Sequence, residues 1–154
     1  MTYERLDIQA GGVRDSLPID YTKCALQGND FVTDTYIASL KPGVAVIMDA
    51  AGYIKPAGGA ATDVVIGFLV NDVAGYVNQN VNARANGLVA VVSGNGTRFA
   101  TDNVVDSDIK AGDLLYAGTG GVLTKTKGTL ETPLAVALNA NSATSKTVVV
   151  KTLV

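Results

Sequence analysis

The chain has 154 residues, of which 47% are hydrophobic and 17% charged, and its formal net charge is −2 at pH 7. This length suits one domain with a sizeable core, and the lack of a basic cluster argues against nucleic acid as a partner. The sequence has no histidine, and its one cysteine, Cys24, can form neither an intramolecular disulfide nor a multi-cysteine metal site. We therefore expect no metal, no cofactor and no nucleophile activated by histidine.

The first forty residues carry many large apolar side chains without a steady period. Gly11–Gly12, Pro18 and Gly28–Asn29 interrupt any regular element. A segment of this kind is expected to lie along another surface as an extended arm. The alternative is an opening strand and a long loop of the same β domain.

The opening MTYERLDIQAGG lacks the basic and apolar regions of a signal peptide. No apolar run approaches the ~18 residues that a membrane-spanning helix needs. We therefore expect a soluble protein, made in a cytoplasm and without a membrane partner.

After residue 40 the chain consists of short runs rich in β-branched residues, most of them bounded by Gly, Asn, Asp or Pro. These runs are VAVIM at 44–48, VVIGFLV at 64–70, LVAVV at 88–92, DLLY at 113–116, PLAVAL at 133–138 and TVVVKTLV at 147–154. Helical patterning is nearly absent, and the spacing is typical of a barrel or sandwich. The sequence predicts an all-β fold, a small β-barrel or sandwich over residues 41–154 that follows an irregular arm over residues 1–40.

An internal repeat is visible when the sequence is shifted by 69 positions. Gly43 then aligns with Gly112 and Gly52 with Gly121, and no gap is needed from Lys41 to Leu69. Each copy reads as K-x-G, an apolar strand, a turn of small residues, a second apolar strand, a loop and a third apolar strand. The same local structure is therefore expected twice.

The glycine-rich GTGG at 118–121 is interpreted as a turn between two strands, because a phosphate cradle would need a helix start behind the glycines. Asn95–Gly96 lies between two apolar runs and predicts a β-hairpin. Asp102, Asp106 and Asp108 lack the spacing of a calcium loop and are interpreted as a solvated loop. No pair of carboxylates stands out, so we expect no enzymatic activity.

The stretch IKAGDLLYAGTGGVLT, followed by PLAVALNANSATSKTVVVKTLV, resembles the C-terminal half of head-decoration, or capsid cement, proteins of tailed bacteriophages. The matching residues are 112–116, 121–124, 135–138 and 148–150, and the earlier copy from Lys41 follows the same pattern at its start. The resemblance covers about residues 41–154 and rests on turn glycines and apolar alternation. It departs from the family at Ala135, where the family often has glycine.

This resemblance implies a virion structural protein on the outer surface of the capsid, which cements the assembled head by bridging neighbouring major capsid protein subunits. It also implies self-association as a homotrimer, with a dimer as the alternative. The arm would lie along the capsid or a neighbouring copy, through a partner interface of Tyr3, Leu6, Ile8, Tyr21, Phe31 and Tyr36. The alternative function is a structural or receptor-binding β module of the tail or fibre.

Overall fold

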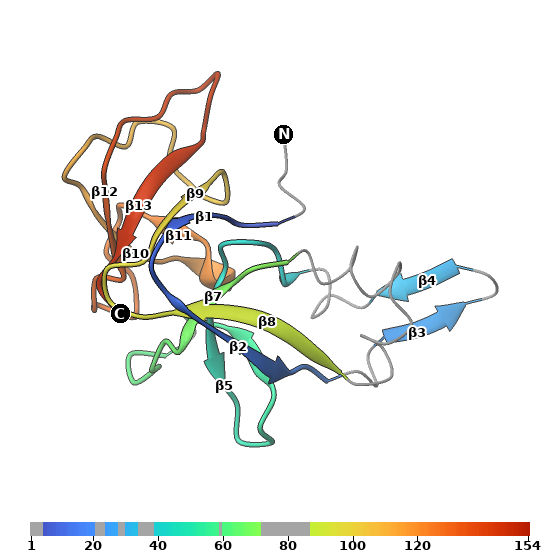
Figure 1. Cartoon of the computed structure of the whole chain (residues 1–154). Helices are drawn as coiled ribbons and strands as arrows, with labels where there is room; N and C mark the ends of the chain where they lie inside the picture. Colours follow the sequence, from blue (N-terminus) through green and yellow to red (C-terminus); the bar gives the residue numbers. More distant parts are fainter. Residues whose placement is uncertain (1–4, 21–23, 28–29, 34–38, 59, 72–86) are drawn as a thin grey trace.

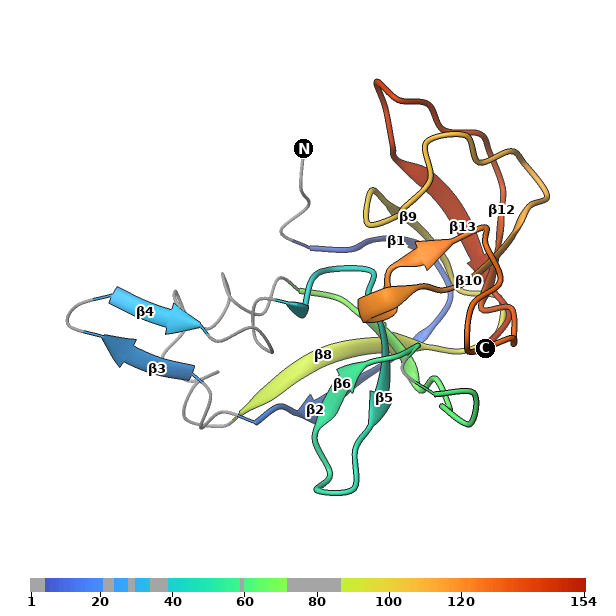
Figure 2. The same ribbon diagram turned by 180° about the vertical axis from the view of Figure 1, so that it is seen from behind.

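The computed structural model describes residues 5–20, 24–27, 30–33, 39–58, 60–71 and 87–154, and the regular secondary structure of this part is almost entirely β (Figures 1 and 2). The strands are β1 (Asp7–Ala10), β2 (Val13–Pro18), β3 (Cys24–Gln27), β4 (Asp30–Thr33), β5 (Ala45–Met48), β6 (Ile54–Pro56), β7 (Gly67–Leu69), β8 (Leu88–Ser93), β9 (Arg98–Thr101), β10 (Leu114–Ala117), β11 (Leu123–Thr124), β12 (Ala135–Ala137) and β13 (Val148–Thr152). Each of the six apolar runs contains a strand, so the all-β prediction is confirmed. No helix within these described ranges is long and apolar enough to cross a membrane.

The described strands form two main antiparallel sheets and one separate hairpin. The six-stranded sheet has the order β1-β9-β13-β12-β10-β11, and the five-stranded sheet has the order β2-β8-β7-β5-β6. Val104, just after β9, forms a bridge with Leu123 of β11, so the six-stranded sheet curls towards closure. The strands β3 and β4 pair with each other, and Figures 1 and 2 show this hairpin apart from both sheets.

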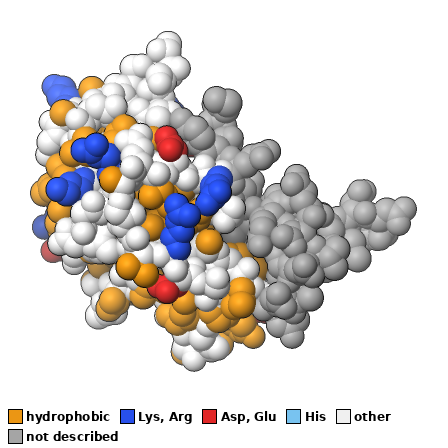
Figure 3. Space-filling model, in the orientation of Figure 1, with side chains coloured by type: hydrophobic (Ala, Val, Ile, Leu, Met, Phe, Trp, Pro, Cys, Tyr) orange, Lys and Arg blue, Asp and Glu red, His pale blue; other side chains and the backbone are white. Residues whose placement is uncertain are grey.

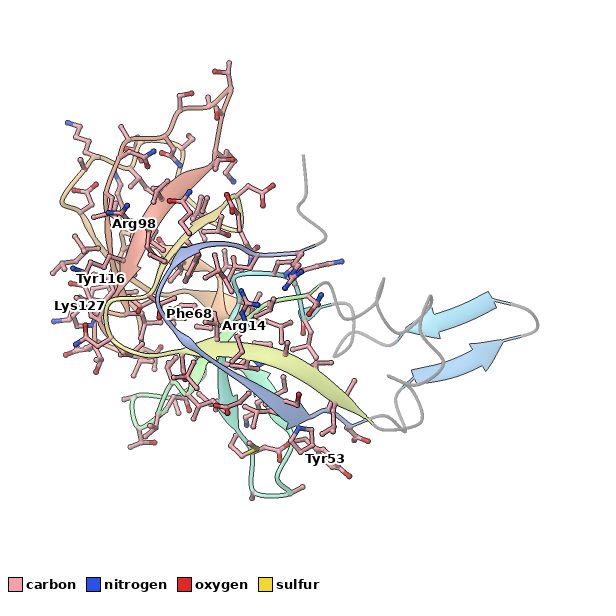
Figure 4. All side chains as sticks on the ribbon, viewed as in Figure 1. Arg14, Tyr53, Phe68, Arg98, Tyr116 and Lys127 are labelled. Atoms are coloured by element: carbon pink, nitrogen blue, oxygen red, sulfur yellow. The ribbon has the colours of Figure 1, made fainter. Side chains whose placement is uncertain are left out.

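The main core lies between the two sheets. Phe68 of β7 and Phe99 of β9 are fully buried there, and their ring centroids are 5.2 Å apart with the planes tilted by 56°. Figure 4 labels Phe68 where the two sheets meet. A second cluster covers the other face of the five-stranded sheet and consists of Ile19, Leu40, Val44, Val46, Ile54, Leu69, Val89 and Val91. Strands β5, β7 and β8 therefore carry apolar residues on both faces, which explains their continuous apolar runs.

The chain passes from one sheet to the other at residues 93–98. Asn95 and Gly96 form a turn, but β8 pairs with β2 and β7 whereas β9 pairs with β1 and β13. The predicted hairpin at this position is therefore wrong, because the turn is a corner where a strand changes sheet. The hydroxyl of the buried Thr152 fastens this corner by donating to the carbonyl of Gly94 at 2.7 Å and accepting from the amide of Thr97 at 3.1 Å.

Part of the opening segment belongs to the two sheets. Strand β1 pairs with β9, and β2 pairs with β8 over its whole length. The expectation of an arm therefore does not hold for residues 7–18, and the alternative of opening strands in the same β body describes them. Leu6, Ile19 and Leu40 are buried in the core clusters of the same body. For residues 1–4 and 21–38, and for the boundary near residue 40, the arm stays a prediction.

The internal repeat is present as two matching sets of backbone hydrogen bonds. The amide of Gly43 donates to Leu69 O at 2.8 Å, and that of Gly112 donates to Ala137 O at the same distance. Both glycines have positive φ, 87° and 91°, which favours glycine at the start of each strand.

The shift of 69 positions holds for the first two strands of each copy. Met48 pairs with Ile54 in one copy, and Ala117 pairs with Leu123 in the other. It becomes 68 for the third strand, because the loop between β11 and β12 is one residue shorter. Leu69 therefore corresponds to Ala137, and the gap-free alignment is corrected by one residue there.

Candidate interaction surfaces

The six predicted interface residues fall into three groups. Tyr3, Tyr21 and Tyr36 lie outside the described residues, and of Phe31 only the backbone, in β4, is described. Leu6 is 4% exposed, lies in the main core, and donates its amide to Val70 O at 2.6 Å. Leu6 is thus a core residue and not a partner contact, because its side chain is already buried within the chain. Ile8 is half-buried and packs against the same core.

A polar hollow of about 500 Å³ lies beside the second repeat. Its lining consists of Asp108, Lys110, Gly112, Asp113, Leu114, Tyr116 and Lys125. The Lys125 ammonium and the Asp108 carboxylate form an ion pair at 2.6 Å. A carboxylate oxygen of Asp113 accepts from the backbone amide of Lys110 at 2.9 Å. Asp108 is thus paired with a cation from the end of β11, and Asp113 is bonded to a backbone amide of its own turn.

The Lys125–Asp108 pair shifts both protonation equilibria in the same sense. The hydrogen bond from Lys125 lowers the pKa of Asp108 below its ordinary value of 3.8, and the same bond raises the pKa of Lys125 above 10.5. Both groups therefore stay charged at neutral pH. The pair lies at the surface, where ion pairs contribute little stability, so it serves to hold the 106–110 loop near β11.

Asp106 connects the same loop to the end of β11. Its carboxylate accepts from the Thr124 hydroxyl at 2.9 Å and from the Lys125 amide at 2.8 Å. The predicted solvated acidic loop is therefore tied to the sheet by side-chain bonds. Within the described ranges no group of three or more His, Cys, Asp or Glu side chains is placed to hold a metal ion.

A smaller and more apolar groove of about 220 Å³ lies where the 60–66 loop meets the C-terminus. It is lined by Asp63, Val64, Val65, Leu130, Thr132, Leu134 and Val154. The Val64 side chain is 74% exposed at its rim. We expected Val64 inside a strand, but β7 begins only at Gly67, so this valine stands in a loop. The sequence alone could not show that Val64 is exposed, because its exposure depends on where β7 begins.

Other large apolar side chains of the described residues are also exposed. They are Val13, Met48, Leu88, Val105, Leu114, Leu138 and Leu153. Figure 3 shows hydrophobic side chains gathered in the lower part of the view, over the region where Figure 1 draws β2 and β5. Met48, Leu88 and the half-buried Leu17 and Pro18 belong to the strands of this region. An apolar area that reaches the free edge of a sheet is typical of a contact surface.

The described residues thus form a two-sheet β protein with an apolar groove at its surface. A family model described as XM1 gp53 minor capsid protein matches residues 16–152. Because this match spans most of the chain, the protein belongs to the XM1 gp53 minor capsid protein family and is a structural component of a bacteriophage capsid. A comparison with curated proteins found no relative.

Proposed function

We propose that this protein decorates the outer surface of the assembled capsid and cements it by bridging neighbouring major capsid protein subunits. The match of residues 16–152 to a minor capsid protein family carries this proposal. The two-sheet body with its shared core supports it, because a bridging protein must hold its contact surfaces at fixed positions. The protein acts by contact and has no catalytic step.

Several weak contacts made at the same time can together give the tight binding that cementing requires. A capsid lattice presents identical subunits at fixed spacing, so modest contacts made at the same time give tight attachment. A protein that binds only the assembled lattice stabilises that lattice by mass action. A homotrimer at a local symmetry axis, with a dimer as the alternative, would multiply these contacts.

The apolar groove beside Val64 is the described surface that we expect to face a capsid subunit. The core of a protein interface is depleted of charge, and this groove has a mostly apolar lining with an exposed valine at its rim. Tyr3, Tyr21, Phe31 and Tyr36 remain proposed contacts of the arm.

The proposal is tested by mixing the purified protein with empty capsids before and after expansion and sedimenting them. We expect saturable co-sedimentation with expanded capsids and a higher melting temperature of the capsids that carry the protein. Val64→Asp should weaken binding, whereas Val105→Asp, at a position that is 58% exposed and outside the groove, should not.

Failure to co-sediment at any salt concentration would refute the cement function and favour a tail or fibre location. If both aspartate variants bind as well as the unchanged protein, the decoration role stands but the groove does not face the capsid.

A further inference from the structure

The five-stranded sheet ends in an open strand. Strand β2 pairs on one side with β8 and, within the described ranges, with no strand on its other side. Its residues from Val13 to Ser16 are exposed. The other outer strands offer less, because β6 has three residues, β11 has two, and β1 has four with an irregularity between Ile8 and Ala10.

The direction of the backbone groups of β2 follows from two hydrogen bonds. The amide of Ile19 donates to Gly87 O at 2.7 Å, and the amide of Val70 donates to Ala90 O at 3.0 Å. Since backbone groups alternate along a strand, the odd-numbered residues of β2 bond to β8. The N–H and C=O groups of Arg14 and Ser16 therefore point outwards, together with the carbonyl of Pro18.

A comparison of the two sheets, which carry the two copies of the repeat, shows that the edge strand β2 has no outer neighbour among the described strands. The order β9-β13-β12-β10-β11 in one sheet corresponds to β2-β8-β7-β5-β6 in the other. Strand β9, the counterpart of β2, is covered on its outer side by β1. Among the described residues the five-stranded sheet has no strand at the equivalent position, so in this part of the chain only the six-stranded sheet carries an outer sixth strand.

The hairpin of β3 and β4 is separate from both main sheets. Strands β3 and β4 pair with each other and, in the described part of the chain, with no other strand. A two-stranded hairpin is marginally stable on its own in water and gains stability when it joins a larger sheet. Figures 1 and 2 show it projecting from the body, where a neighbouring molecule can reach it.

The charges of β2 disfavour pairing with a second β2. Two antiparallel registers in which Arg14 and Ser16 bond outwards overlap equally: one places Asp15 opposite Asp15 of the other copy, and the other brings Pro18, which has no N–H, opposite Arg14. A further shift shortens the overlap and places Arg14 opposite Arg14. Strand β4 has one charged residue, Asp30, at its first position, so most registers with β2 bring no like charges opposite each other.

We propose that the outer edge of β2 accepts β4 of the hairpin from a neighbouring copy of the same chain, which completes the five-stranded sheet as β1 completes the other. Each copy then gives one strand and receives one, a head-to-tail contact that closes into a ring. This contact needs no capsid, so it stands or falls independently of the cement function.

The test uses two proline variants that block opposite halves of the contact. Ser16→Pro removes an N–H that points outwards and leaves the bonds to β8 intact. Val32→Pro disrupts β4 and leaves the β2 edge open. Asp15→Pro is the matched control, because it removes an N–H that bonds to β8 and should lower the melting temperature of the body.

Light scattering coupled to size exclusion measures the result without capsids. We expect the unchanged protein to have a mass that is a multiple of 15.8 kDa, and each of the two blocked variants to run as a monomer with the melting temperature unchanged. An equimolar mixture of Ser16→Pro and Val32→Pro should form a one-to-one complex, because one variant keeps the hairpin and the other keeps the edge.

A monomeric unchanged protein, an oligomeric Ser16→Pro variant that is folded, or a mixture that does not associate would each overturn the proposal. If Ser16→Pro loses its β-type circular dichroism, Val32→Pro decides alone, because its substitution lies outside both main sheets. A monomer then supports the proposal and an oligomer refutes it.

Discussion

The close approach of Gly121 to the five-stranded sheet allows a sharp test of how the two repeats are joined. Gly121 ends the short η2 turn (Thr119–Gly121) with φ of 73°. A Cβ atom there would overlap the backbone oxygen of Ala45 and lie 2.9 Å from Val44 Cγ1. Gly121→Ala therefore imposes both a left-handed backbone on alanine and a steric conflict with β5. Gly120 has the same φ of 73° but no atom within 4 Å of its Cβ position, so Gly120→Ala imposes only the first cost.

The two costs have separate magnitudes. A left-handed conformation costs a residue other than glycine about 1–2 kcal/mol. Overpacking adds about 1–3 kcal/mol, because the obstructing atom is backbone and cannot rotate away. Gly121→Ala should therefore destabilise the protein by about 2–5 kcal/mol and Gly120→Ala by about 1–2 kcal/mol. For a protein of this size 1 kcal/mol corresponds to a shift of about 2–4 °C in Tm.

Denaturant unfolding and thermal melts of both variants measure the difference directly. Equal destabilisation of the two would refute the close contact between the η2 turn and β5. An unchanged stability of both would refute the turn itself, because positive φ would then carry no cost.

Three further predictions concern the core, the corner and the charged loop. Phe99→Ala should destabilise the protein by about 3–5 kcal/mol in denaturant unfolding, because it removes a fully buried ring that joins the sheets; a loss below that of an exposed substitution would contradict the shared core. Thr152→Val keeps the shape of the side chain but removes its two bonds at the corner, so we expect a loss of about 1–3 kcal/mol in the same assay. The Asp108 carboxyl should titrate below 3.8 by NMR and return towards that value in Lys125→Met. Since its folded pKa is lowered, the contribution to stability is present above the unfolded pKa and is lost as the pH falls through the folded value; an unchanged midpoint in the variant would show that the ion pair does not form in solution.

The strands of the body could be predicted because their signal is local. Runs such as VVIGFLV and TVVVKTLV are rich in β-branched residues and are bounded by turn residues, and both contain strands in the structure. The two K-x-G starts at Lys41 and Lys110 also have a local cause, because each glycine takes positive φ at the beginning of its strand. Runs of β-branched residues and the turn residues that bound them are therefore enough to predict an all-β fold.

The pairing of distant segments could not be predicted in this way. Asn95–Gly96 does turn the chain, but no residue near this turn indicates that β9 joins a different sheet from β8. Strands β1 and β2 have no period of their own because they lie at the edges, where one strand partner and few core contacts select the residues. Leu6 was expected to contact a partner because a large apolar side chain in an irregular segment has the same appearance whether it faces its own core or a neighbour.

Surface contacts are the least predictable part of the molecule. The exposure of Val64 depends on where β7 begins, and the open edge of β2 depends on which strands pair with β8. Neither property follows from the residues themselves. The family match spans residues 16–152 as one block, so it defines the structural role but identifies no contact residue.

A reconstruction of the virion by electron microscopy tests the central claim most directly. We expect density for the two-sheet body on the outside of the shell, with each copy in contact with more than one major capsid subunit. Density confined to the tail or its fibres, or to the inner face of the shell, would contradict the account.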